Sequence, residues 1–223
     1  MICIGAKNLI KEELAIKSEM PLFKNRIHAG KLLAFQLKSY KKSDAIVLAI
    51  PRGGIPVAYV VAQKLNLPLD IILTKKIGHP DNKEFAIGWV SLNSYYVDLA
   101  YDVTKEYVKN EVKRIRKLMN EKYQLYMGNK EPLSITNKTI ILIDDGIATG
   151  YTMLAAIKTL REKKVHQIIV AVPVAPKDDS LGLKNISDDF ISLMTPEQFL
   201  SVGSFYDDFG EVSDEEVVQI LNS

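Results

Sequence analysis

Two adjacent carboxylates, Asp144 and Asp145, directly follow the apolar run Ile-Ile-Leu-Ile at residues 140–143. This run contains no turn former and is typical of a strand that is buried on both faces. Residues 153–160, Met-Leu-Ala-Ala-Ile-Lys-Thr-Leu, have the composition and spacing of a helix. The two acids therefore stand at the carboxyl end of a predicted strand, where paired carboxylates could bind the vicinal hydroxyls of a sugar.

The turn between these acids and the predicted helix suits an anion. Thr149, Gly150 and Thr152 lie where backbone N–H groups and hydroxyls converge at a helix N-terminus, an arrangement that binds phosphate. The alternative interpretation is a buried strand followed by an acidic helix N-cap, which is common in α/β proteins. One acid would satisfy that alternative, whereas two acids and Thr-Gly-X-Thr favour a ligand site.

A second turn, Ala-Ile-Pro-Arg-Gly-Gly at residues 49–54, also lies between a predicted strand and a predicted helix. The paired glycines Gly53 and Gly54 allow the backbone to approach a ligand closely. Arg52 offers a planar fork of N–H donors that suits phosphate oxygens. Arg-Gly-Gly alone also fits an ordinary turn, but its position one strand–helix unit ahead of the paired acids favours a second anion site.

Residues 75–84, directly after another predicted strand, contain three lysines together with Gly78 and Pro80. This composition predicts a mobile lid that carries positive charge, beginning with Lys75 and Lys76. His79 could protonate a leaving group, although a lone histidine in a polar loop is more often a bystander.

Apolar strands and helices alternate along the chain and must position these turns. Strands are predicted at residues 45–50, 69–74, 139–144 and 167–172, and helices at 26–40, 55–65, 104–126 and 152–163. The alternation predicts an α/β fold with a mainly parallel, twisted sheet that has helices on both faces. Ligands bind such sheets outside the carboxyl ends of the strands, at a topological switch point.

Composition and charge are those of an ordinary globular protein. The chain has 223 residues, of which 47% are hydrophobic and 25% charged, so it can bury a substantial core. The net charge of +2 is too balanced to favour nucleic acid as a partner. A single cysteine, Cys3, excludes an internal disulfide framework. Neither a bilayer-spanning apolar run nor a secretory signal is recognisable. We therefore expect a cytoplasmic location and no membrane partner.

The stretch from residue 140 to 152 resembles the phosphoribosyl-pyrophosphate (PRPP) motif of the type I phosphoribosyltransferases. The resemblance implies that Asp144 and Asp145 bind the ribose 2- and 3-hydroxyls and take part in catalysis. It also implies that the following turn wraps the 5-phosphate of PRPP, so that the ribose and 5-phosphate site includes Gly146, Ile147, Ala148, Thr149, Gly150, Tyr151 and Thr152.

The same resemblance assigns the pyrophosphate of PRPP to the two other turns. Arg52, Gly53 and Gly54 match the loop that holds pyrophosphate in the family, and this loop often has a cis peptide before its basic residue, here Pro51–Arg52. Lys75 and Lys76 match a paired basic dipeptide in a flexible loop that closes over PRPP, with Lys76 as a catalytic residue. Mg²⁺ is implied as a cofactor bound mainly through PRPP, so no protein residue is assigned as a metal ligand.

The activity implied is transfer of the phosphoribosyl group from PRPP to a small nitrogen acceptor, with release of pyrophosphate. Ala148 stands where the 6-oxopurine enzymes have an aspartate base, which disfavours hypoxanthine and guanine. The turn is nearer to the adenine, orotate or uracil type, and the acceptor base is not identified. One alternative is a regulator that binds PRPP or a nucleotide without turnover. Another is a hydrolase or phosphotransferase that uses the same pocket.

The remaining expectations concern the ends of the chain and the long basic helix. Residues 1–19 are expected to form an N-terminal extension and residues 20–223 the phosphoribosyltransferase-like domain. Assembly into a homodimer is one possibility that the sequence does not decide. The helix at 104–126 has an apolar stripe, which indicates that this side packs over the sheet while the basic side faces solvent. The alternative is that the basic side binds RNA or polyphosphate. Aromatic rings gather near the C-terminus, at Phe199, Phe205, Tyr206 and Phe209. Some of these rings could stack on a base in a small variable hood. For most of them, docking on the domain as a hydrophobic tail is favoured.

Overall fold

The computed structural model describes residues 23–98, 100–178 and 182–223. The extension predicted at residues 1–19 lies outside these described residues. Its centre is a five-stranded sheet with the order β2-β1-β6-β7-β8, in which every neighbouring pair is parallel. The strands are β1 (Ile46–Ala49), β2 (Leu69–Ile71), β6 (Thr139–Ile143), β7 (Gln167–Val174) and β8 (Asp189–Met194). The predicted α/β class is confirmed.

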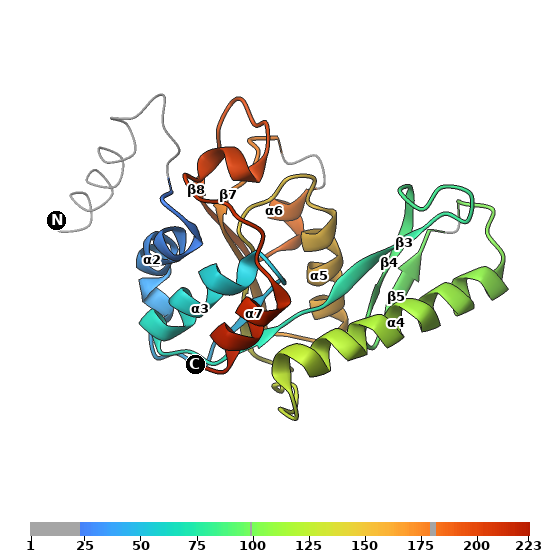
Figure 1. Ribbon diagram of the computed structural model, residues 1–223, viewed down its shortest axis with the longest axis horizontal. Helices are drawn as coiled ribbons and strands as arrows, with labels where there is room; N and C mark the ends of the chain where they lie inside the picture. Colours follow the sequence, from blue (N-terminus) through green and yellow to red (C-terminus); the bar gives the residue numbers. More distant parts are fainter. Residues whose placement is uncertain (1–22, 99, 179–181) are drawn as a thin grey trace.

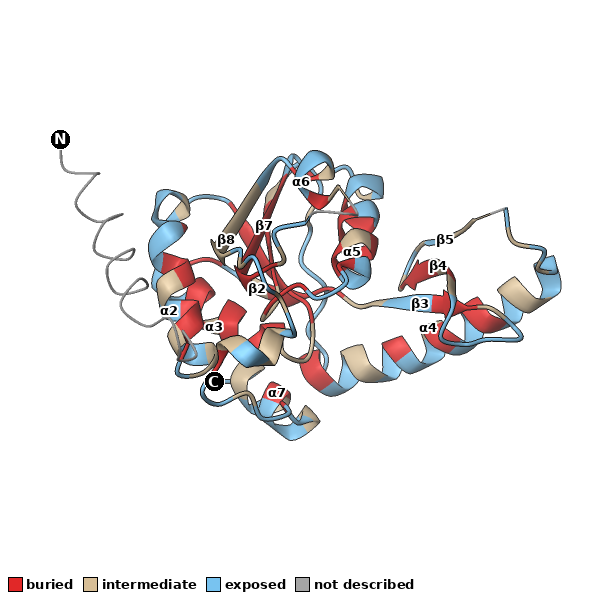
Figure 2. Ribbon diagram, turned by 90° about the horizontal axis from the view of Figure 1, so that it is seen from above, coloured by how far each residue is buried: buried red, intermediate tan, exposed pale blue. Residues whose placement is uncertain are grey.

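Helices cover both faces of this sheet, as predicted (Figure 1). Val47 and Ala49 pack with one set of helices, whereas Ile46 and Leu48 pack with the other. The first set is α2 (Arg26–Gln36), α3 (Gly54–Leu65) and α7 (Asp214–Leu221), and the second is α5 (Tyr151–Glu162) and α6 (Leu183–Ile186). Successive strand residues point to opposite faces, so burial on both sides requires the continuous apolar runs seen in the sequence. Figure 2 shows this buried layer between exposed helix surfaces.

The connections after β1 and β6 diverge at the middle of the sheet. These strands are neighbours, yet α3 follows β1 onto one face and α5 follows β6 onto the opposite face. Loops that leave adjacent parallel strands in opposite directions form the crevice in which open α/β sheets bind ligands. The switch point therefore lies between the turn at residues 51–53 and the turn at residues 144–150.

A second, antiparallel sheet was not predicted from the sequence. Its strands are β3 (Thr74–Gly78), β4 (Ala86–Ser91) and β5 (Tyr95–Val97). Helix α4 (Lys105–Met127) packs against it and, with the sheet, projects from the parallel core (Figure 1). The apolar stripe predicted on α4 is confirmed at the buried residues Val112, Ile115, Met119 and Tyr126.

Several predicted boundaries were wrong where tertiary pairing decides the structure. The strand predicted at 69–74 ends at Ile71, and Thr74 begins β3. Residues 75–78, predicted as the start of a loop, therefore lie in a strand, because β4 supplies a hydrogen-bonding partner that local propensity does not reveal. The predicted helix at 26–40 ends at Gln36, before a short 3-10 helix. Closure of the β3–β4 hairpin over a ligand stays a prediction.

The C-terminal aromatic rings mostly dock on the core, in line with the favoured interpretation. The Tyr206 ring lies 5.2 Å from Phe23 and 4.9 Å from Phe209, and the Phe199 and Phe205 rings stack at 5.7 Å. Ser213 caps α7 by accepting a hydrogen bond from the Glu216 N–H at 3.1 Å. Within the described segments, no helix combines the length and apolar character needed to cross a membrane.

Candidate active site

The paired acids lie immediately after β6 and are partly buried. Asp144 accepts a hydrogen bond from the Asp145 N–H at 2.8 Å. Asp145 accepts one from Nε of Arg26 at 2.8 Å, and these two side chains are only 13% and 12% exposed. The Arg26 guanidinium also lies 3.9 Å above the Phe209 ring. An arginine at the start of α2 thus fixes the orientation of Asp145, a role that sequence reasoning missed.

The glycines after β1 lie against these same acids. A Cβ atom at Gly53 would collide with the Asp145 carboxylate, and one at Gly54 would lie 2.8 Å from the Ile143 carbonyl oxygen. The sequence predicted that Gly53 and Gly54 let the backbone approach a ligand. The structure gives a further reason for glycine at both positions: a side chain there would prevent the turn at residues 51–53 from packing on the end of β6.

Burial and mutual repulsion raise the pKa of Asp144 well above its ordinary value, burial being the larger cause. Burial also raises the pKa of Asp145, but the hydrogen bond and charge of Arg26 oppose this effect. The ion pair with Arg26 therefore favours a charge on Asp145, while Asp144 is the member of the pair that more readily holds a proton.

The Asp144→Asn variant should show how this raised pKa affects stability. The folded chain binds the Asp144 proton more tightly than the unfolded chain does, so wild-type stability falls as pH rises from about 4 through the raised pKa. Asparagine keeps the oxygen that accepts from Asp145 and has no charge to bury. Thermal unfolding from pH 4 to 8 should therefore show a stability advantage of the variant that grows with pH. A variant that is less stable than wild type at pH 8 would contradict the assignment.

The turn at the start of α5 has the geometry of an anion site. Gly150 has φ +79°, a left-handed conformation that disfavours side chains, and the helix N-terminus has no side-chain cap. Ala148, Thr149, Tyr151 and Thr152 are exposed around it. Gly146 and Ile147 instead face the core: Ile147 donates its N–H to the Val174 carbonyl at 2.9 Å. The turn at residues 148–152 therefore carries the exposed part of the predicted phosphate site.

A cleft of about 320 Å³ lies beside this turn. Its walls come from the loops after β1 and β2, from the start of β3, from α4 and from the first turn of α5. The lining residues are Ile50, Pro51, Arg52, Ile72, Leu73, Thr74, Lys75, Met119, Lys122, Tyr126 and Thr152. Of the predicted site residues, the cleft brings together Arg52, Lys75 and Thr152. The Pro51–Arg52 peptide bond at its edge is cis, as the family resemblance implied.

The predicted cations Lys75 and Lys76 separate because they are consecutive residues of β3. Side chains alternate along a strand, so the two lysines point to opposite faces. Lys75 lines the cleft, whereas the Lys76 ammonium donates to the Glu84 carboxylate at 2.7 Å. His79 is not among the cleft residues; its Nδ1 accepts from the Asp81 N–H at 3.2 Å.

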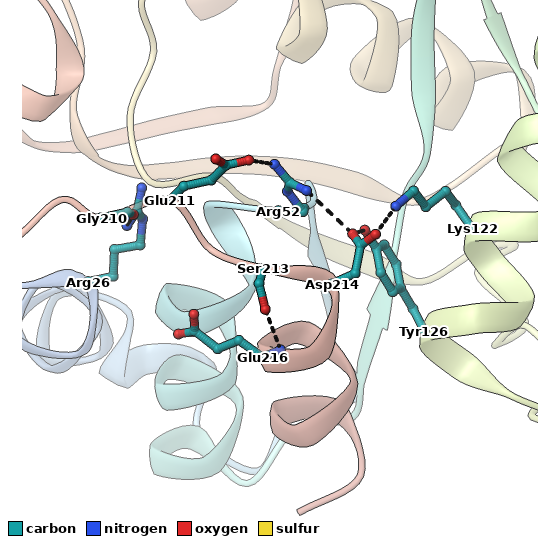
Figure 3. A network of polar contacts seen from close by, with 9 residues as sticks. All are labelled: Arg26, Arg52, Lys122, Tyr126, Gly210, Glu211, Ser213, Asp214 and Glu216. Atoms are coloured by element: carbon teal, nitrogen blue, oxygen red, sulfur yellow. Dashed lines mark hydrogen bonds and ion pairs between the residues drawn. The ribbon is translucent and has the colours of Figure 1, made fainter.

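Arg52 is held by two acids near the start of α7 (Figure 3). Its guanidinium pairs with Glu211, and its Nη1 lies 3.5 Å from Oδ1 of Asp214. Asp214 also accepts from the Lys122 ammonium and from the Tyr126 hydroxyl. Sequence reasoning predicted a solvated basic face on the helix at 104–126, which contains Lys122, and no local pattern indicated that Lys122 meets Asp214 at the cleft.

No metal centre is evident in the parts of the chain that the structure describes. Within those residues, no group of three or more His, Cys, Asp or Glu side chains is placed to hold a metal ion. Asp144 and Asp145 are two adjacent carboxylates, a donor set that suits Mg²⁺ when substrate oxygens and waters supply its other ligands.

Comparison with known proteins agrees with this architecture. A family model described as a phosphoribosyl transferase domain matches residues 22–209. Over 209 residues the chain is 32% identical to "Putative phosphoribosyl transferase MT0597" and to "Putative phosphoribosyl transferase Rv0571c", both from Mycobacterium tuberculosis. The match covers 91% of this chain and 47% of each relative, so the chain spans about half the length of these curated relatives.

A solved structure shares the fold over nearly the whole domain. The crystal structure of TT1426 from Thermus thermophilus superposes with a TM-score of 0.80 at 36% identity, and the match covers 89% of this chain and 97% of that one. The family resemblance inferred from the acids and the Ala-Thr-Gly turn is confirmed. This chain belongs to the phosphoribosyltransferase family.

Proposed function

We propose that the protein transfers the 5-phosphoribosyl group of PRPP to a small nitrogen acceptor and releases pyrophosphate. The observation that carries this proposal is the cleft at the switch point, where Arg52, Lys75 and Lys122 gather beside an uncapped helix N-terminus. A ligand with phosphate groups at both ends of a sugar matches this arrangement. Helix N-termini and clustered cations both favour bound phosphate.

Each part of PRPP has a corresponding group of residues. The 5-phosphate is bound by backbone N–H groups and hydroxyls of the turn at residues 148–152. Asp144 and Asp145 accept hydrogen bonds from the ribose hydroxyls. Arg52 and Lys75 bind the pyrophosphate.

In the proposed reaction, a nitrogen lone pair forms a bond to C1 of the ribose while the bond from C1 to pyrophosphate breaks. The bonding electrons leave with the pyrophosphate, and positive charge develops on the sugar. Cations preorganised around the leaving group stabilise this separation of charge. Holding the acceptor and C1 in line supplies further acceleration, since effective molarities for well-oriented groups reach about 10⁵–10⁸ M.

We also propose Mg²⁺ as the cofactor, bound mainly through PRPP. The ion would neutralise part of the pyrophosphate charge. Mg²⁺ commonly keeps several waters and takes one or two carboxylates together with substrate phosphates, a demand that Asp144 or Asp145 could meet.

Release of pyrophosphate from PRPP, measured with a panel of purine and pyrimidine bases and Mg²⁺, tests the function. Release that depends on one base is expected. Tight PRPP binding without release in the presence of any base would instead support a non-catalytic regulator. Slow release without any base would point to a hydrolase. Wild-type protein that does not bind PRPP by calorimetry would contradict the proposal.

A further inference from the structure

We propose that Lys122 of α4 binds the pyrophosphate of PRPP and that Asp214 of α7 is the residue that positions it. This inference rests on the proposed function and adds a substrate contact outside the turns at residues 51–54, 75–84 and 144–152. It arises from two observations: Lys122 lines the cleft, and its ammonium group pairs with Asp214.

Lys122 lies on the part of the cleft wall that α4 supplies. Arg52 enters the cleft from the loop after β1, whereas Lys75 and Lys122 belong to β3 and α4, which pack together. Pyrophosphate bound in the cleft would contact cations from three elements: the loop after β1, β3 and α4. The Lys122 side chain is 42% exposed, so a ligand can reach it.

Asp214 joins two cations of the cleft, Arg52 and Lys122, into one network (Figure 3). Besides Lys122, it accepts a hydrogen bond from the Tyr126 hydroxyl at 2.5 Å and lies 3.5 Å from Arg52. Hydrogen bonds from Lys122 and then Tyr126 lower the pKa of Asp214 to about 2, so its carboxylate is charged at neutral pH. Its place in the first turn of α7 also favours negative charge.

The pairing with Asp214 leaves Lys122 able to bind a ligand. An ammonium group has three N–H donors, and a guanidinium has five. Lys122 donates to Asp214, and Arg52 pairs with Glu211 and Asp214. Both cations therefore retain donors for phosphate oxygens while Asp214 fixes their positions. The Glu211 side chain is 79% exposed and is the more easily displaced of the two acids.

The test compares Lys122→Met with Lys117→Met on the same helix. Lys117 is 80% exposed and does not line the cleft, so its variant removes the same charge outside the proposed site. Binding is measured by calorimetry with PRPP, inorganic pyrophosphate and ribose 5-phosphate, each with Mg²⁺. Lys122→Met is expected to weaken PRPP and pyrophosphate binding about tenfold or more, the effect of losing a charge-assisted hydrogen bond.

Two further measurements separate a ligand contact from a structural role. Ribose 5-phosphate lacks the pyrophosphate, so its affinity should be the same for Lys122→Met and wild type. Lys122→Arg should restore much of the pyrophosphate affinity, because a cation again reaches the cleft. Equal weakening of all three ligands, or pyrophosphate binding by Lys122→Met that matches wild type, would overturn the assignment of Lys122.

Asp214→Asn tests the positioning role. It is expected to weaken pyrophosphate binding, since Lys122 and Arg52 lose their shared partner. Tighter binding by this variant would mean that Asp214 competes with pyrophosphate, which would overturn positioning. If wild-type protein binds neither PRPP nor pyrophosphate, the proposed function itself fails. If wild type binds both and Lys122→Met is unchanged, the function stands and only Lys122 is excluded.

Discussion

Replacing both Asp144 and Asp145 by asparagine is expected to weaken PRPP binding by about 30- to 100-fold. Hydrogen bonds to charged groups contribute about 1.5–3 kcal/mol each and neutral ones about 0.5–1.5 kcal/mol, so converting at least two of them loses about 2–3 kcal/mol. About 1.4 kcal/mol corresponds to a tenfold change in affinity. Calorimetric titration of PRPP in the presence of Mg²⁺ measures the loss.

The structure gives this prediction its controls. Asp145→Asn weakens the ion pair with the largely buried Arg26, so circular dichroism must show that the double variant is folded at the titration temperature. Asp44→Asn removes a carboxylate that pairs with Lys138 at the amino ends of β1 and β6, away from the acids at the carboxyl end of β6, and should leave PRPP affinity unchanged. Wild-type affinity in the folded double variant would exclude the acids from the ribose site.

Lys75→Met is expected to lower the turnover number by about 100-fold, whereas Lys76→Met should change it by only a few fold. Removing one preorganised donor to a developing negative charge typically costs about 10²–10³ in turnover. Lys75 lines the cleft, but Lys76 lies on the other face of β3 and pairs with Glu84. The two variants remove the same charge one residue apart, so a difference between their turnover numbers shows which face of β3 meets the pyrophosphate. Steady-state release of pyrophosphate measures both.

The expected pattern for Lys75 is a larger effect on turnover than on PRPP affinity. An interaction that strengthens as charge develops on the leaving group acts mainly in the transition state. A large loss for Lys76→Met with none for Lys75→Met would contradict the cleft as the pyrophosphate site. It would indicate that the β3–β4 hairpin rearranges on binding and brings Lys76 to the ligand.

The sequence was sufficient to predict the elements whose pattern is local. The run at residues 140–143 is apolar at every position because β6 is buried on both faces. The acids follow it directly, and Gly150 ends the turn that leads into α5. The same reasoning located β1, α3, α5 and the stripe on α4 to within a few residues. Propensity and periodicity suffice here, since neighbours along the chain determine them.

The antiparallel sheet could not be predicted in this way. Residues 74–78 contain two lysines, which have low strand propensity, and they form β3 because β4 pairs with them. That pairing then places Lys75 and Lys76 on opposite faces, which a flexible loop would not do. The sequence indicated a basic dipeptide after a strand, but only the sheet determined which lysine lines the cleft.

The sequence by itself determined the family, the parallel α/β core and the turns that carry its acids, glycines and Arg52. The tertiary structure decided which side chains complete the site. Arg26 meets Asp145 across 119 positions of the chain, and Lys122 meets Asp214 across 92. Such pairs depend on how α2, α4 and α7 pack around the sheet. Contacts between side chains so distant in sequence leave no local pattern, because packing alone brings them together.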